Sequence, residues 1–272
     1  MIDSHLHLWS LGKNGCRWPG ADLPEIHRDF TLEDAKAVAG PAGVNGAVLV
    51  QSQPDAADTE FLLKQAEGEK FIRAVVGWSD LLSPDAPSRI AALARRPKLR
   101  GLRPMLQNLP DGWINNPGLD PAIEAMIEHD LAFDALVFTR HLPGLRHFAE
   151  RHPKLRIVID HAAKPPIASG EIDAWRSAIA ALADLPQVHC KLSGLLTEAG
   201  VRRDAAALAP YVEHLLVRFG ASRLIWGSDW PVLTLAGDYE GWLAQARALT
   251  GGTPGDIFGG NALRFYGCSD KA

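Results

Sequence analysis

The amino-acid sequence predicts an α/β fold, specifically a single (β/α)8 TIM barrel that occupies residues 1–272. Short apolar runs alternate with longer amphipathic runs along the chain, which is typical of parallel strands joined by helices. Eight such repeats are present, and eight strands close a barrel in a chain of about 250 residues. An open doubly wound sheet is the alternative. It is disfavoured because no Gly-rich phosphate loop follows the first strand.

Each repeat begins with an apolar run that we expect to form a strand. Strands are predicted at residues 2–8, 46–51, 72–78, 100–104, 132–137, 156–160, 188–192 and 224–227. Helices are predicted at residues 32–39, 58–67, 87–95, 121–129, 142–151, 172–183, 205–219 and 239–249, with a closing helix over 254–266. Start signals support several of these helices: Thr31 with Asp34 three residues later, Asp85 before Pro87, and Asp120 before a proline.

The composition is that of an ordinary globular protein, with 47% hydrophobic residues, 22% charged residues and a net charge of -4. No basic excess is present, so we expect no nucleic-acid partner. We expect no membrane span or signal peptide, because no apolar run approaches roughly 20 residues and the first residues lack a basic and apolar leader. Cys16, Cys190 and Cys268 are widely separated. They predict neither a disulfide framework nor a thiolate zinc site, and they favour the cytoplasm.

A pair of histidines two residues apart opens the chain, in the sequence Met-Ile-Asp-Ser-His-Leu-His-Leu-Trp. Residues i and i+2 of an extended strand share a face, so Asp3, His5 and His7 are expected to point the same way. Two neighbouring imidazoles can bind a divalent metal such as zinc. The pattern alone also fits two strand histidines that only form hydrogen bonds with their neighbours.

Two further reactive groups follow later apolar runs. Asp160 and His161 end the sixth expected strand, and Asp229 lies in Gly-Ser-Asp-Trp-Pro after the eighth. The carboxyl ends of all strands of a TIM barrel converge on one mouth, where His161 and Asp229 are expected to meet His5 and His7. Because side chains alternate along a strand, only one of Asp160 and His161 is expected to point inward. Asp229 can ligate a metal or take a proton from water, although its position also fits a helix cap.

The other histidines lie where no chemistry is needed. His189 comes early in the seventh expected strand, so we place it near the barrel floor or the helix layer. The remaining ones are expected in helices, at helix ends or in loops: His27, His129, His141, His147, His152 and His214.

Two segments are longer than most loops and fall at the predicted mouth, residues 10–30 and 105–119. We interpret them as loops that cover the substrate. Tryptophans gather at the same end, and their flat apolar faces suit sugar rings or aromatic ligands. The predicted substrate-binding residues are Trp9, Trp78, Trp113, Trp230, Gln51, Arg103 and Lys164.

Six short motifs resemble those of the amidohydrolase superfamily, in particular its branch of sugar lactonases. In chain order they are IDSHLHLW at residues 2–9, RGLR at 100–103, IDHAAKP at 159–165, KLSGL at 191–195, WGSDWP at 226–231 and NALRFY at 261–266. Each motif alone is weak. The ordered set spans nearly the whole chain and is specific.

The resemblance implies a TIM barrel whose site lies at the carboxyl mouth. It implies that His5, His7, His161 and Asp229 form the reactive cluster and bind one divalent metal, for which zinc is the expected ion. A binuclear site is not expected, because the fourth strand ends in Arg103 rather than in the bridging lysine of binuclear members. Some related lactonases work without a metal, so the resemblance also leaves a metal-free reaction open.

We expect a hydrolase that opens a small-molecule sugar lactone, an aldono-lactone, to the aldonic acid. Asp229 and His161 are the expected catalytic residues: Asp229 takes the proton of the attacking water, and His161 completes the metal shell or stabilises the oxyanion. Three alternatives remain: a pyrone-dicarboxylate type of lactonase, a metal-dependent aromatic acid decarboxylase of the same superfamily, and a non-catalytic sugar-binding barrel. The first would require several arginines at the mouth. The sequence does not predict the oligomeric state.

Overall fold

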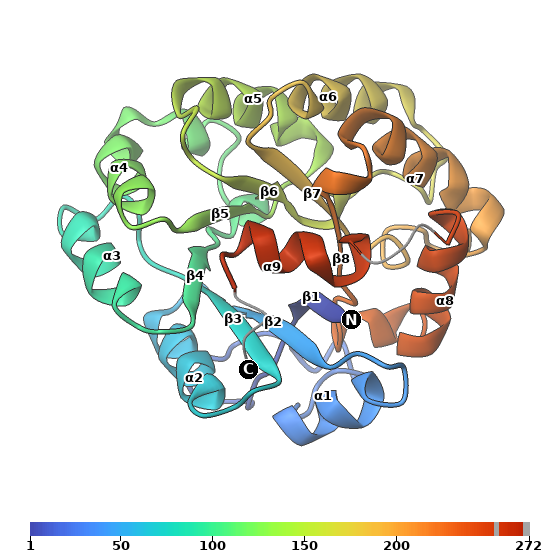
Figure 1. Cartoon of the computed structure of the whole chain (residues 1–272), viewed down its shortest axis with the longest axis horizontal. Helices are drawn as coiled ribbons and strands as arrows, with labels where there is room; N and C mark the ends of the chain where they lie inside the picture. The colour runs from blue at the N-terminus through green and yellow to red at the C-terminus, as the bar shows by residue number, and fades with distance from the viewer. Residues whose placement is uncertain (253–255, 269–272) are drawn as a thin grey trace.

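A computed structural model, which describes residues 1–252 and 256–268, has the predicted barrel architecture (Figure 1). Its described residues form an eight-stranded parallel sheet whose strands follow one another in chain order. The strands are β1 (Ile2–Leu6), β2 (Gly46–Val50), β3 (Ile72–Gly77), β4 (Leu99–Leu102), β5 (Ala132–Ala135), β6 (Ile157–Ile159), β7 (Val188–Leu192) and β8 (Leu224–Trp226). Most end one or two residues before the expected boundary, and residues such as His7, Gln51 and Arg103 follow the strand ends at the mouth.

Helices surround the strands as an outer layer (Figure 1). They are α1 (Leu32–Ala39), α2 (Ala56–Ala66), α3 (Ala86–Ala94), α4 (Asp120–Glu128), α5 (Leu142–Arg151), α6 (Asp173–Ala183), α7 (Ala205–Phe219) and α8 (Tyr239–Leu249). The expected capping box is present, since Thr31 and Asp34 exchange side-chain and backbone hydrogen bonds. Asp85 was expected to cap α3, but its carboxylate accepts hydrogen bonds from Ser83 and Arg89 and makes no capping bond. In the described part of the chain, every helix falls short of the length or hydropathy that crossing a bilayer requires.

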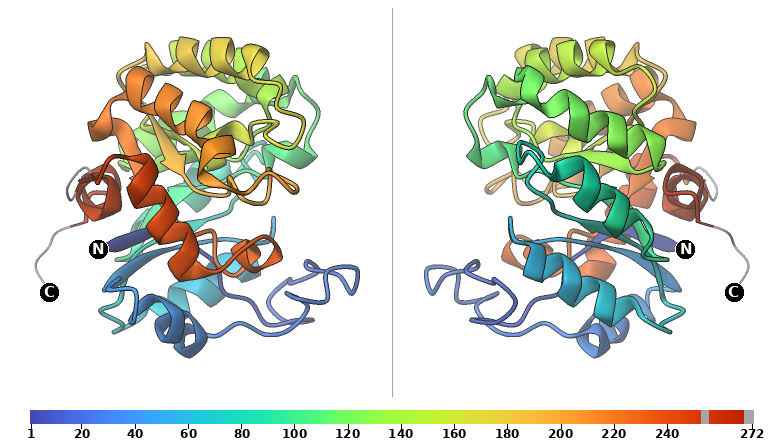
Figure 2. Two further views of the ribbon diagram at one scale, coloured as in Figure 1. Left: turned by 90° about the vertical axis from the view of Figure 1, so that its right-hand side faces the viewer. Right: turned by 90° about the vertical axis from the view of Figure 1, so that its left-hand side faces the viewer.

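The final helix closes one end of the barrel. α9 (Asn261–Phe265) lies across the ring of strands (Figure 1), where Phe265 and Tyr266 pack on inward-facing residues such as Val48 and Ile225. The long loop after β1 projects from the opposite end (Figure 2). The helix expected over 254–266 is shorter than predicted: residue 254 lies outside the described residues, and Asp256–Gly260 forms an irregular turn before α9. The site is therefore expected at the end opposite α9.

A bulge in β1 determines which of its side chains face the interior. The register between β1 and β2 shifts between Asp3 and Leu6, which interrupts the strict alternation of the strand. Asp3 therefore points away from His5 and His7, and its carboxylate accepts a hydrogen bond from the hydroxyl of Tyr239 in α8 at 2.9 Å. The expectation that all three side chains share a face was wrong for Asp3.

His189 lies at the barrel floor, as its early position in the seventh strand predicted. Its ring packs against Phe265 of α9 with the ring centroids 4.8 Å apart. Burial lowers the pKa of His189 to about 4. The pKa of His161, at the other end of the barrel, is also lowered by burial to about 4.

We expect the protein to lose stability as the pH falls from about 6.5 to about 4. Over this range the histidines of the unfolded chain, with an ordinary pKa of about 6.5, bind protons that buried His189 and His161 do not. His189→Phe is expected to make the pH dependence shallower, measured as the urea midpoint at pH 7.5 and pH 5. A variant that loses as much stability as the wild type between these pH values would contradict the assignment.

Candidate active site

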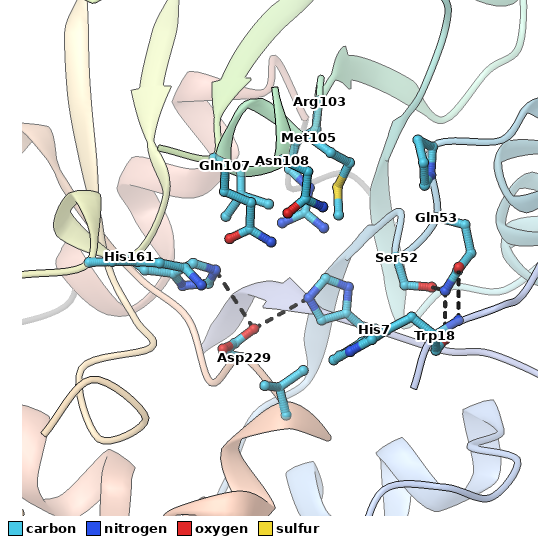
Figure 3. A pocket seen from close by; sticks show the side chains of 14 residues that line it. His7, Trp18, Ser52, Gln53, Arg103, Met105, Gln107, Asn108, His161 and Asp229 are labelled. Atoms are coloured by element: carbon cyan, nitrogen blue, oxygen red, sulfur yellow. Dashed lines mark hydrogen bonds and ion pairs between the residues drawn. The ribbon is translucent and has the colours of Figure 1, made fainter. Parts of the chain in front are cut away.

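A cavity of about 290 Å³ opens among the carboxyl ends of the strands (Figure 3). This volume is at the lower end of the range for small-molecule sites. The lining includes His7 after β1, Arg103 after β4, His161 after β6 and Asp229 after β8. The backbone N–H of Asp229 donates to the carbonyl of His5 at 2.9 Å, which joins the last strand's end to the first. Closure of the barrel therefore brings these distant residues together.

Three imidazoles surround one carboxylate oxygen of Asp229. The distances from Asp229 Oδ1 are 3.3 Å to His7 Nε2, 3.7 Å to His5 Nε2 and 3.9 Å to His161 Nε2. All four side chains are buried. Ligand atoms around a tetrahedral zinc ion with bonds of 2.0–2.1 Å lie about 3.3–3.4 Å apart. The ligand atoms of His5, His161 and Asp229 all lie within 4.8 Å of one another, and this set could hold a divalent metal beside His7.

Hydrogen bonds on the far side of two rings fix their orientation. His7 Nδ1 lies 2.7 Å from the carbonyl oxygen of Val50, so Nδ1 donates and the Nε2 lone pair faces Asp229. His161 Nδ1 lies 2.9 Å from Ser193 Oγ. Metal-binding histidines commonly use their second ring nitrogen in this way. The types of donor, their spacing and their orientation fit one divalent metal.

The close approach of the β7 loop to His161 requires a glycine. Gly194 has a φ of 63°, and a Cβ atom there would lie 2.5 Å from His161 Nδ1. Glycine alone combines this left-handed conformation with the absence of a side chain. Gly194 thereby lets the neighbouring Ser193 reach the imidazole.

A fully buried charged cluster supports His5 from beneath. Lys191 Nζ of β7 lies 2.6 Å from Asp134 Oδ2, 3.0 Å from Asp160 Oδ1 and 3.1 Å from His5 Nδ1. Tyr266 donates its hydroxyl hydrogen to Asp134 Oδ2 at 2.6 Å. The ammonium of Lys191 is therefore paired with both carboxylates and lies within hydrogen-bond distance of the imidazole. The cluster connects the helix at the barrel floor to the imidazole at the mouth.

The position of the proton on the His5 ring depends on whether Nδ1 forms a hydrogen bond with Lys191 or with Asp160. Nδ1 lies 3.1 Å from Lys191 Nζ and 3.5 Å from Asp160 Oδ1. With a proton on Nδ1, Nε2 carries the lone pair; it lies 3.3 Å from Arg103 NH1 and would be the ligand atom for a metal. Acceptance of a hydrogen bond from Lys191 instead places the proton on Nε2, facing Asp229. Both arrangements hold the ring in the same place.

The backbone is left-handed at two of the reactive positions. The φ angles are 51° at His161 and 61° at Asp229, and positive φ continues through residues 161–164. Such conformations cost of order 1–3 kcal/mol per residue and gather at functional sites. The turn also explains an incorrect expectation at the end of β6. Asp160 points inward to Arg103, with Oδ2 and NH1 3.2 Å apart, while the left-handed turn directs His161 to Asp229 as well.

At neutral pH the ionised carboxylate of Asp229 faces the uncharged imidazoles of His5 and His161. Burial lowers the pKa of His161 to about 4, and burial together with the Lys191 charge lowers that of His5 well below its ordinary value. Burial raises the pKa of Asp229, but the electrostatic interaction with the surrounding imidazoles, that with His161 first, outweighs burial and holds the pKa of this carboxyl below its usual range. Neutral imidazoles and a carboxylate are the protonation states that metal binding and proton acceptance require.

The predicted substrate-binding residues separate into two groups. Arg103 and Lys164 line the cavity. Gln51 lies behind Arg103 and donates to its carbonyl oxygen at 2.7 Å. The four predicted tryptophans fall outside the described lining of the cavity: Trp9, Trp78, Trp113 and Trp230. Of these, Trp9 is buried beneath the loop after β1, with its indole N–H donating to the carbonyl of Arg28 at 2.8 Å.

The cavity also contains side chains that were not selected from the sequence. Trp18 and Gln53 lie on one side of it, and Gln107 and Asn108 contribute amides from the loop after β4 (Figure 3). Gln107 Oε1 is buried and has no hydrogen-bond partner among the described residues, so it can accept a hydrogen bond from a ligand. The one sequence signal for the two amides was their place in a loop expected to cover the mouth.

Comparisons with known proteins identify the family of this chain. The amidohydrolase family model matches residues 2–268. The chain is 54% identical over 274 residues to the L-fucono-1,5-lactonase of Burkholderia ambifaria, covering 97% of this chain and 94% of that protein. It is 36% identical over 290 residues to the L-fucono-1,5-lactonase of Burkholderia multivorans, covering 100% and 97%. A solved amidohydrolase from Burkholderia multivorans with bound zinc has a TM-score of 0.91 at 34% identity, covering 98% of this chain and 99% of that one. This chain therefore belongs to the amidohydrolase family.

Proposed function

We propose that this protein is a sugar lactonase that hydrolyses an aldono-1,5-lactone, such as L-fucono-1,5-lactone, to the open aldonic acid. The observation that carries the proposal is the convergence of three imidazoles on Asp229 in a cavity of about 290 Å³. Two relatives with the name L-fucono-1,5-lactonase support the choice of substrate. A lactone is an activated ester, so its hydrolysis requires less barrier reduction than that of an amide.

We propose that His5, His7, His161 and Asp229 bind one divalent metal, and zinc is the ion we expect. The ligand atoms of His5, His161 and Asp229, which all lie within 4.8 Å of one another, support this assignment, as does the zinc in the solved Burkholderia multivorans relative. A metal bound there would polarise the lactone carbonyl and lower the pKa of a bound water.

Each polar residue of the site has a separate role in the proposed hydrolysis. As the oxygen of water attacks C1 of the lactone, Asp229 accepts the proton that the water releases. The bond between C1 and the ring oxygen then breaks, and the ring oxygen takes this proton to become a hydroxyl. Arg103 and Lys164 contribute positive charge to the cavity wall, which stabilises the oxyanion that develops at C1. The product is the aldonic acid, which ionises at neutral pH.

The charges of the cavity favour a neutral hydroxylated ligand over a dicarboxylate. Both cationic side chains among the described lining residues already have carboxylate partners. Arg103 NH1 lies 3.2 Å from Asp160 Oδ2, and Lys164 Nζ lies 3.6 Å from Glu198 Oε1. A pyrone dicarboxylate would require further arginines to pair its two carboxylates. The amides of Gln107 and Asn108 suit sugar hydroxyls better.

We place the reaction in the cytoplasm. Cys16, Cys190 and Cys268 are all unpaired thiols, which suits a reducing compartment. The partner that the site requires is a small sugar lactone.

A screen of stereochemically varied aldono-lactones tests the proposed function. Acid release is followed with a pH indicator, with and without added zinc or manganese, and carbon dioxide release from aromatic acids is measured in parallel. We expect turnover of 1,5-lactones and no carbon dioxide. Failure of the folded, metal-loaded protein on the whole lactone library would contradict the assignment. Carbon dioxide release would instead identify the decarboxylase alternative.

Removal of the metal is expected to lower both activity and stability. Chelation should decrease lactone turnover at least about tenfold, since the metal supplies part of the carbonyl polarisation. It should also lower the temperature of unfolding, because a ligand that binds only the folded state stabilises it. Both effects should reverse when zinc is added back. Full activity in protein shown to be metal-free would refute the metal assignment but leave the lactonase assignment standing.

A further inference from the structure

We propose that Trp18 is the platform on which the lactone ring stacks and that Gln53 positions it; this inference rests on the proposed lactonase function. Trp18 lines the cavity and is 36% exposed, which is unusual for a large apolar side chain fixed by several neighbours. A half-exposed indole at a cavity wall is an apolar surface that a ligand can cover.

The side chain of Gln53 holds Trp18 by its backbone. Gln53 Oε1 accepts hydrogen bonds from the N–H groups of Arg17 at 3.1 Å and Trp18 at 3.2 Å. Gln53 Nε2 donates to the carbonyl oxygen of Trp18 at 2.7 Å. The two dashed lines between Gln53 and Trp18 mark part of this arrangement (Figure 3). One amide thus satisfies three backbone groups of a loop that has no regular secondary structure there.

Gln53 is itself held firmly. It is 3% exposed, and its backbone N–H donates to Asp58 Oδ2 at 3.0 Å. Asp58 also accepts the N–H of Ser52 at 2.7 Å and lies in the first turn of α2. A chain of hydrogen bonds therefore connects the backbone of Trp18 to Gln53, and Gln53 to Asp58 in α2. Through these contacts the helix helps to hold Trp18 in place.

The remainder of the loop packs on the same segment after β2. Gly15 has a φ of 73°, and a Cβ atom there would lie 2.5 Å from Asp55 Cγ, so the loop approaches as closely as a glycine permits. The ring of Trp18 also meets that of Trp9 edge-on, with the centroids 5.4 Å apart. Trp9 is buried and pairs with Phe30, which pins the base of the loop. Trp18 is thus held through its backbone by Gln53 and at its ring by Trp9, while its exposed part lines the cavity.

The chemistry of the cavity indicates how the lactone would lie. One face of a pyranose-type ring presents C–H groups that suit an indole, while its hydroxyls require hydrogen-bond partners. Gln107 and Asn108 contribute such partners to the same cavity, and Gln107 Oε1 lacks one of its own in the described structure. The indole would therefore select for a cyclic sugar, and the amides would distinguish the orientation of its hydroxyls.

The platform predicts a specific kinetic pattern. Trp18→Ala should raise KM for the best lactone about tenfold, because stacking on an aromatic ring is lost, and should change kcat by less than about threefold, because Asp229 is untouched. Gln53→Leu should raise KM similarly and add little in the Trp18→Ala background. Gln53→Glu keeps an acceptor for the two N–H groups and should be intermediate. Trp113→Ala is the matched control, since Trp113 lies in the other long loop and outside the described cavity lining.

Hydrogen exchange of the Arg17 and Trp18 amides reports the role of Gln53 directly. Exchange at both amides should accelerate in Gln53→Leu and stay at the wild-type rate in Trp113→Ala. An unchanged KM in Trp18→Ala, with wild-type lactone turnover intact, would overturn the platform while the lactonase function stands. A wild type without activity on any aldono-lactone would overturn both. Unchanged amide exchange in Gln53→Leu would overturn the positioning role of Gln53.

Discussion

Asp229→Asn is expected to lower kcat for lactone hydrolysis by roughly 10²–10⁴-fold, the range that a general base contributes. An amide has nearly the shape of the carboxylate but cannot accept the proton of the attacking water. Asn also tolerates left-handed backbone well, so the φ of 61° at this position should persist. Acid release under saturating lactone measures kcat, and a urea titration of the same sample checks that the variant is folded.

A matched carboxylate at the mouth provides the control for this change. Asp111 lies 3.1 Å from His141 Nε2 and 3.0 Å from Arg140 Nε, is largely exposed, and lies outside the described lining of the cavity. Asp111→Asn removes the same charge from the same end of the barrel and should retain near-wild-type kcat. Retention of more than a third of wild-type kcat by folded Asp229→Asn would show that another group accepts the proton.

The reactive cluster could be predicted from the sequence because closure of the barrel determines which strand ends lie side by side. Short apolar runs mark strands, parallel strands bring their carboxyl ends to one mouth, and His161 and Asp229 follow two such runs. Their meeting with His5 and His7 follows from topology and does not depend on the detail of any loop. Strand alternation was a weaker guide: a bulge in β1 redirected Asp3, and a left-handed turn brought both Asp160 and His161 inward.

The cavity wall could not be predicted to the same degree, because it depends on loop conformation. Strand-end position suggested Trp9 as a ligand contact, yet its indole N–H is used by the Arg28 carbonyl beneath the loop. Trp18, nine residues later, lines the cavity, and the side-chain amide of Gln53 forms hydrogen bonds with its backbone. Such a pairing between a side chain and an irregular loop has no periodicity in the sequence. Only the three-dimensional contact reveals it.

The largest expected effect on stability concerns Lys191, which the reaction itself does not require as an acid or base. Lys191 Nζ and Asp134 Oδ2 are 2.6 Å apart, and both side chains are fully buried. Lys36 Nζ and Glu69 Oε2 are also 2.6 Å apart, but those side chains are 42% and 23% exposed. The two pairs have the same length, but they differ in their access to water and in the further contacts of Lys191 with Asp160 and His5. Replacing each lysine by methionine therefore compares the loss of an ion pair in a buried and in an exposed environment.

Lys191→Met is expected to destabilise the protein by roughly 3–5 kcal/mol, because it leaves the buried carboxylate of Asp134 without its cation. Lys36→Met should cost about 0–1 kcal/mol, since water solvates the released carboxylate. Urea unfolding at pH 8 measures both. The loss in Lys191→Met should shrink at pH 5: without Lys191, burial raises the pKa of Asp134 further above its unfolded value, so the folded variant binds a proton that relieves the buried charge. Equal losses in the two variants, or a loss at position 191 that does not change with pH, would mean that the buried cluster is not held by charge pairing. In that case Lys191 would support His5 through packing of its aliphatic stem alone.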